Sequence, residues 1–365
     1  MYGFLLYGFG PALDALREEL DVSRAAIGTA GSAMAAGGIA AALVARRTLA
    51  LAGAANTLRA CLALMALGAV VLITASQTVM AAVAGACIGA GGGLLLVAVP
   101  VLVERRQPLA RAAVLAEANA SAAAAGVAAP LAVGGATLAG LGWETGIAVG
   151  IPAALVLAVL VGRTGLGRGE AGEEPHHATA GGLPAAYFRW VATLVTVVGI
   201  EFCIVFWAPD YLQEETGMRQ GTAGASLGLF VAGMALGRVT GGRLAVHRRP
   251  EHLLAGGLTV ALAGLALFWS ALAPAVSIAG LFVTGCGISV LYPMALSLAM
   301  RAAPANPQGA SVVASVGSGS AILVAPFALA AVGDAIGIRP AFTLVFALAA
   351  AGLALTHPAP RAAGA

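Results

Sequence analysis

The sequence predicts an all-α protein that crosses a lipid bilayer twelve times, as two six-helix halves built on one pattern. Three observations support this fold class. Hydrophobic residues make up 60% of the 365 residues and only 10% are charged, which is too few to cover the surface of a soluble protein. Apolar runs of roughly 20 residues, the length that a membrane-spanning helix needs, recur from end to end. The third observation is an internal repeat.

The repeat shows as residues that recur at one fixed displacement: Asp210 follows Asp14 by 196 positions (210 − 14). Matching alanines carry little weight in so alanine-rich a chain, whereas matching charges are informative because charges are rare. A parallel repeat of a multi-helix half within lipid is how many secondary transporters are built. The recurring pairs include Asp14/Asp210, Glu18/Glu214, Glu19/Glu215, Arg47/Arg243, Arg105/Arg301, Pro108/Pro304 and Pro130/Pro326.

Apolar runs between charged or turn-rich breaks give the spans in order. In the first half they are 2–16, 24–45, 52–74, 78–102, 112–135 and 144–162; in the second they are 188–212, 222–244, 253–273, 275–299, 309–332 and 338–357. We therefore divide the chain into a six-helix bundle at 1–162, a polar glycine-rich linker at 163–187, a second bundle at 188–357 and a tail at 358–365.

Arginine placement predicts the orientation. The chain has no lysine, and fifteen of its nineteen arginines fall on the side of the linker and both termini. By the positive-inside rule this side is cytoplasmic, so the protein is predicted to lie in the cell membrane with both termini inside. The opposite side is acidic.

The first span is short: only thirteen residues precede Asp14, or about 20 Å of helix against a hydrocarbon core of about 30 Å. The repeat equivalent of Phe188, where span 7 starts, would lie before Met1. We expect the first helix to begin in the middle of the membrane, and a start codon downstream of the true one would account for this.

Several classes of function are disfavoured. A net charge of +3 gives no reason to expect nucleic acid, and the four cysteines lie within apolar runs at unrelated spacings, as core residues do. The signatures of phosphate-binding loops, zinc proteases and serine hydrolases are missing. We therefore expect a monomer that is not an enzyme and binds no metal or cofactor.

Two basic loops carry a resemblance to a known family. The stretch GRVTGGRLAVHRRP at Gly237–Pro250 resembles the loop motif of the major facilitator superfamily, in which an aspartate caps a helix and latches one conformation. Val246 stands at the aspartate position here, and Ala45 stands there in the first-half copy, so the resemblance leaves that latch in doubt. The residues that the resemblance assigns to gating are Arg46, Arg47, Gly242, Arg243, Arg248 and Arg249.

Two further stretches point to different branches of that family. GVAAPLAVGG at Gly126–Gly135 is similar to a motif of antiporters, with Ala129 in place of a glycine; Pro130 and its equivalent Pro326 are predicted to bend their helices. GIEFCIVFWAPDYL at Gly199–Leu212 resembles the sugar-permease branch, which includes fucose permeases. The resemblance implies a secondary transporter of a small organic solute, with the branch open.

Glu201 is the sharpest candidate for chemistry, because it lies deep in span 7, far from other charges. A carboxylate there costs at least ~2.5 kcal/mol on insertion scales, so we expect it to face an aqueous cavity and carry a coupled proton. A structural hydrogen bond to a neighbouring helix is the alternative. Glu117 could line the cytoplasmic vestibule or pair with Arg59 or Arg105. The further candidates for solute or proton contacts are Asn119, Tyr7, Trp207, Tyr211 and Tyr292.

The predicted function is therefore alternating-access transport of a small solute, coupled to protons. A drug or metabolite efflux antiporter of the same fold is the alternative within this class. A membrane sensor without flux is the alternative outside it.

Overall fold

The computed structural model describes residues 1–163 and 182–356 as a bundle of long helices. In chain order they are α1 (Tyr2–Leu20), α2 (Arg24–Ile73), α3 (Thr78–Arg106), the 3-10 turn η1 (Pro108–Ala110), α4 (Arg111–Leu138), α5 (Trp143–Ala148), α6 (Gly150–Arg163), α7 (Ala185–Thr216), α8 (Gln220–Ala245), α9 (Pro250–Ser270), α10 (Pro274–Ile288), α11 (Leu291–Ala302), α12 (Pro307–Ile336), α13 (Ile338–Ala341) and α14 (Thr343–Thr356).

Ten helical segments within the described ranges are long and apolar enough to cross a membrane. The predicted number of twelve spans is reached when α2 is counted as two spans and the more polar helix α1 is added. α2 holds fifty residues, about 75 Å if straight, yet Gly53 interrupts it with φ 76° and ψ 168°. Glycine adopts this backbone without steric cost, so the chain turns there, at the start of the predicted span 52–74. The protein is an integral membrane protein.

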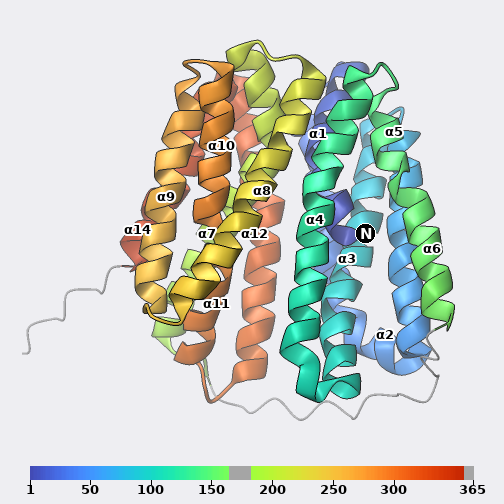
Figure 1. The fold of residues 1–365 in the computed structure, drawn as a ribbon, viewed down its shortest axis with the longest axis vertical. Coiled ribbons are helices and arrows are strands. Elements are labelled where there is room, and N and C mark those ends of the chain that lie inside the picture. The colour runs from blue at the N-terminus through green and yellow to red at the C-terminus, as the bar shows by residue number, and fades with distance from the viewer. Residues whose placement is uncertain (164–181, 357–365) are drawn as a thin grey trace, which may run out of the picture.

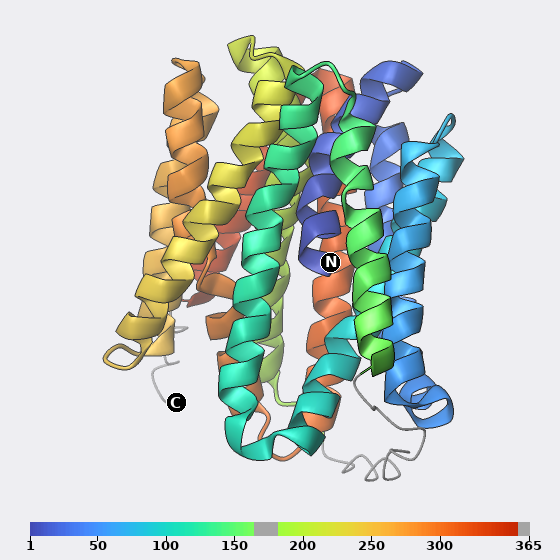
Figure 2. The same cartoon turned by 45° about the vertical axis from the view of Figure 1, so that its right-hand side comes forward.

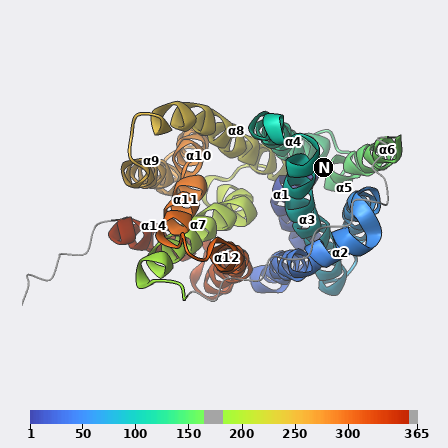
Figure 3. The same cartoon turned by 90° about the horizontal axis from the view of Figure 1, so that it is seen from below.

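The helices form two groups. Seen from below, α1 to α6 gather on one side and α7 to α14 on the other, with α8 beside α4 and α12 beside α2 (Figure 3). Helices α1 and α7 meet where the two groups adjoin, because a Cβ at Gly10 of α1 would overlap the carbonyl oxygen of Val205 of α7. The arrangement has the two groups that the repeat predicts.

The predicted repeat reappears in how the helices pack. A Cβ at Gly89 of α3 would overlap the carbonyl oxygen of Met34, and a Cβ at Gly285 of α10 would overlap that of Phe230. Both members of the first contact precede those of the second by 196 positions. Small residues let helix backbones approach closely where lipid offers no hydrophobic drive between helices.

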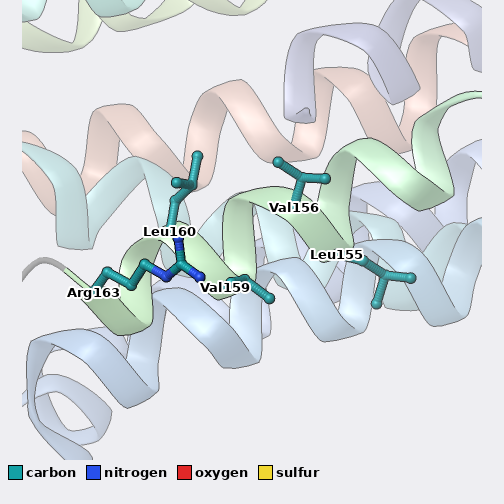
Figure 4. A pocket seen from close by; sticks show the side chains of 5 residues that line it. All are labelled: Leu155, Val156, Val159, Leu160 and Arg163. Atoms are coloured by element: carbon teal, nitrogen blue, oxygen red, sulfur yellow. The ribbon is translucent and has the colours of Figure 1, made fainter.

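The outward-facing surface is apolar. Leucines and valines such as Leu51, Leu96, Val159 and Leu267 are exposed around the bundle, as expected of side chains that face lipid. A shallow hollow on α6 belongs to this surface, because four of its lining residues are aliphatic and the fifth, Arg163, lies at the end of the helix (Figure 4).

Several helix boundaries differ from the sequence prediction by a few residues. α7 begins at Ala185, inside the range assigned to the linker, because Pro184 precedes the helix in an extended conformation and provides its start. α1 has nineteen residues and α7 has thirty-two. The chain starts halfway down the bundle, while α4 continues to its lower end (Figure 2), as expected for a first helix that begins mid-membrane.

Candidate functional site

Glu201 lies near the middle of α7, at the junction of the two halves. Its side chain is partly exposed, whereas the eleven residues that follow it are buried. The phenol of Tyr7, on α1 of the first half, donates a hydrogen bond to Glu201 Oε1 at 3.0 Å. The ring of Tyr7 packs closely against Gly126 of α4, and its hydroxyl lies 3.9 Å from the sulfur of Met234. Two sequence-predicted candidates, Tyr7 and Glu201, are thus brought together.

Arg238 is a member of this site that sequence reasoning missed. It lies on α8, is exposed, and interacts electrostatically with both Glu201 and Tyr7. In the sequence it counts among the arginines of the basic side. The signal that could have identified it is depth: α8 continues for seven residues beyond Arg238, to Ala245, or about two turns of helix.

Tyr292 of α11 completes the group from the side of the second half. It is 40% exposed and interacts with Glu201 and with Ser318 of α12. We name these five residues (Tyr7, Glu201, Arg238, Tyr292 and Ser318) the central cluster. It brings one carboxylate, one guanidinium and three hydroxyls from five helices to a single place, which suits hydrogen bonding to a small polar solute.

Trp207 and Tyr211 are placed differently from the prediction that they contact a solute. Trp207 is 3% exposed, and its indole donates to the carbonyl of Pro326 at 2.9 Å. Tyr211 is fully buried, donates to the carbonyl of Trp269 at 2.6 Å and packs against Phe268. Both rings serve contacts between helices in this conformation, so the central cluster does not include them.

A Trp207→Phe substitution tests that placement. We expect the variant to be less stable by about 1–2 kcal/mol, because the Pro326 carbonyl loses its donor in a buried setting. Thermal unfolding in detergent measures this loss, with Trp190→Phe as the matched control. Loss of solute binding at unchanged stability would instead make Trp207 a solute contact.

The other candidates lie toward the arginine-rich end. Glu117 and Asn119 are exposed on α4, as are all residues from 116 to 121. Arg59 does not pair with Glu117; its guanidinium lies beside Gly162 and is 3.5 Å from the amide oxygen of Asn56. The side chain of Arg105, the alternative partner, lies outside the described residues. This end of α4 is thus open, and the vestibule interpretation of Glu117 stays a prediction.

The gating candidates are exposed residues at the same end. Arg46 and Arg47 lie on α2, Gly242 and Arg243 on α8, and Arg248 and Arg249 just before α9. None of these arginines forms an ion pair with a described side chain. Pro130 and Pro326 are buried inside α4 and α12.

The acidic end is closed by contacts between the two halves. Arg17 of α1 bonds Asp210 of α7 at 2.7 Å, and Ser32 of α2 donates to the carbonyl of Leu323 of α12 at 2.8 Å. In the views of Figures 1 and 2 this end is the upper one. The central cluster therefore lies below a closed end and above an exposed one.

Comparison with known proteins identifies the fold. The chain resembles in structure the nucleoside transporter NupG (TM-score 0.71, 12% identity, covering 97% of this chain and 96% of that one). It also resembles a bacterial homologue of the human lysosomal transporter Spinster, solved in an inward-facing and occupied conformation (0.64, 15%, 97% and 90%). The E. coli fucose:proton symporter FucP is similar too (0.58, 18%, 97% and 96%).

At these identities the three structures show a shared fold. No curated protein matches the chain in sequence. The sequence model of the Major Facilitator Superfamily matches residues 1–326, which is most of the chain and includes the central cluster. The chain belongs to the Major Facilitator Superfamily and is a membrane transporter.

Proposed function

We propose that the protein is a secondary active transporter that moves a small organic solute across the cell membrane, with one proton carried by Glu201. The observation that carries the proposal is the hydrogen bond between Tyr7 and Glu201, which joins the two halves at a carboxylate in the middle of an apolar helix. Ionisable groups at such depth mark ion and substrate pathways.

Alternating access supplies the mechanism. The acidic end is closed by contacts between the halves, while polar residues such as Glu117, Asn119 and Ser315 are exposed toward the arginine-rich end. The arginine-rich end is cytoplasmic by the positive-inside rule, so this conformation is open inward. Rocking of one half against the other would expose the central cluster to the outside instead. One chain contains both halves, so we expect it to work as a monomer.

The solute is first identified by thermal stabilisation of the purified protein. A ligand that binds only the folded state raises its stability in proportion to the logarithm of its concentration over Kd. Fucose and a nucleoside such as uridine belong in the panel, because structurally similar proteins carry those names. Arg238 in the central cluster argues for including carboxylated sugars and other organic anions.

Flux then tests the proposal. Proteoliposomes with an inward-directed pH gradient are expected to accumulate the identified solute and to lose the accumulation when a protonophore collapses the gradient. Movement of protons in the direction opposite to the solute would make the protein an efflux antiporter. Binding without flux under any gradient would contradict the proposal and favour a sensor.

A further inference from the structure

The acidic end holds a network of hydrogen bonds that crosses from one half to the other. We name it the acidic-end network. Its acceptors and donors are Asp14, Arg17 and Glu18 on α1, Arg24 on α2, Asp210, Gln213 and Glu214 on α7, and Gln220 on α8.

One arm of this network is charged. Arg17 Nη2 lies 2.7 Å from Asp210 Oδ1, and Arg24 Nε lies 2.6 Å from Asp210 Oδ2. Arg24 also pairs with Glu214. Asp210 is 2% exposed and the two arginines are mostly buried, so water and salt screen these pairs far less than surface pairs.

The other arm uses mainly neutral donors, although Arg17 Nη2 also lies 3.6 Å from Asp14 Oδ1. The amide of Gln213 donates to Asp14 Oδ2, and that of Gln220 donates to Glu18 Oε2 at 2.8 Å. Both arms have carboxylate acceptors, and a hydrogen bond with an ionised acceptor is roughly twice as strong as a neutral one. Only in the arginine arm is the donor charged as well, which adds Coulomb attraction between opposite charges. The second arm is therefore the weaker one.

The two arms are repeat equivalents of each other. Arg17 and Gln213 differ by 196 positions, and so do Arg24 and Gln220. Their acceptors follow the same rule, because Asp14 and Asp210 are equivalent, as are Glu18 and Glu214. The network is thus a pair of matched contacts in which arginine donates from the first half and glutamine donates from the second.

Asp334 of α12 fixes the position of Arg24. Its two carboxylate oxygens accept from the backbone N–H groups of Arg24 and Ala25, at 2.9 and 2.8 Å. A carboxylate at the start of a helix is favourable because the first N–H groups have no partner within the helix. The second half therefore holds both the backbone and the side chain of Arg24.

We propose that the acidic-end network is the latch that keeps the transporter closed to the outside, and that its arginine arm supplies most of the holding strength. Any outward opening must separate α1 and α2 from α7 and α12, which breaks these bonds. At the other end the loop motif has Val246 and Ala45 where the family latch needs an aspartate. None of the gating arginines at that end forms an ion pair with a described side chain, so we expect the acidic-end network to favour the inward-open state. The inference rests on the proposed function for the cycle that the latch serves.

The test measures the opening of the acidic end directly. Spin labels at Ala139 and Leu272, both exposed at that end in different halves, report the distance between the halves after the four native cysteines are replaced by alanine. The labelled parent should give one short distance.

Arg24→Gln should add a population at longer distance and raise the open-to-closed ratio by about tenfold or more, because a buried Asp210 loses one of its two cations. Arg219→Gln is the control, since Arg219 lies at the same end, exposed and outside the network.

Moving the arginine to its repeat equivalent completes the test. In Arg24→Gln/Gln220→Arg, the new arginine faces Glu18, and we expect the short distance to return. Glu214→Gln removes one partner of Arg24 at a half-exposed site; it should give a smaller shift in the same direction and serves if Arg24→Gln does not fold. The latch is overturned if Arg24→Gln gives the same distances as the control Arg219→Gln. If Arg24→Gln does not fold, the same comparison is made with Glu214→Gln. The labels report without any solute, so failed transport and a failed latch are told apart.

Discussion

Glu201→Gln is expected to abolish accumulation of solute driven by a pH gradient while leaving solute exchange largely intact. A transporter that moves one proton with each solute can accumulate it about tenfold per pH unit, since each 1.4 kcal/mol is a factor of ten. In the variant we expect no net uptake into empty proteoliposomes, while labelled solute outside still exchanges for unlabelled solute inside. Uptake of labelled solute into proteoliposomes, with and without a gradient, measures both properties.

The physical reason lies in what an amide keeps and loses. Glutamine has nearly the shape of protonated glutamate and still accepts the hydrogen bond from Tyr7, which lies 3.0 Å from Glu201 Oε1. It cannot release a proton. The half-cycle that returns the empty carrier needs that release, because otherwise the proton never leaves on the other side. Exchange of one solute for another needs no such step.

The matched control is Glu251→Gln, which makes the same chemical change in the first turn of α9, away from the central cluster. It should accumulate solute as the parent does. Gradient-driven accumulation by Glu201→Gln at the parent's level would remove Glu201 from proton coupling and leave its hydrogen bond to Tyr7 as purely structural.

Gly89→Ala and its repeat equivalent Gly285→Ala are expected to produce the largest losses of stability. A methyl group at Gly89 would overlap the backbone carbonyl of Met34, and one at Gly285 would overlap that of Phe230. A backbone atom cannot swing aside as a side chain does, so α3 or α10 must move away from its neighbour. Overpacking of this kind costs about 1–3 kcal/mol or more. Thermal unfolding in detergent measures the effect.

Gly256→Ala on α9 provides the control, because a methyl group there meets nothing within 4 Å. Alanine is the better helix former by about 1 kcal/mol, so this variant should be as stable as the parent or slightly more stable. Equal stability of Gly89→Ala and Gly256→Ala would show that α3 and α2 are not in close backbone contact.

The sequence determined the fold class, the spans and the repeat, for reasons that are local or periodic. Apolar runs of spanning length report membrane helices because lipid cannot satisfy an open backbone. A displacement of 196 positions appears in Asp14 and Asp210 whether or not the chain is folded. Depth along α7 is also a property of the sequence, so the sequence alone marks Glu201 as a candidate, whereas its hydrogen bond with Tyr7 depends on how α1 packs against α7.

The tertiary structure decided which faces of the helices meet. Trp207 and Tyr211 follow Glu201 within the same helix, yet both rings turn into helix contacts while Glu201 stays partly exposed. In the sequence Arg238 is one of the arginines of the basic side, and only the packing of α8 shows that it interacts with Glu201. The repeat placed equivalent residues at Arg17 and Gln213, but only packing of the halves sets them opposite Asp210 and Asp14. Rotation about a helix axis and the pairing of helices distant in the chain depend on contacts between them, and a single sequence does not record those contacts.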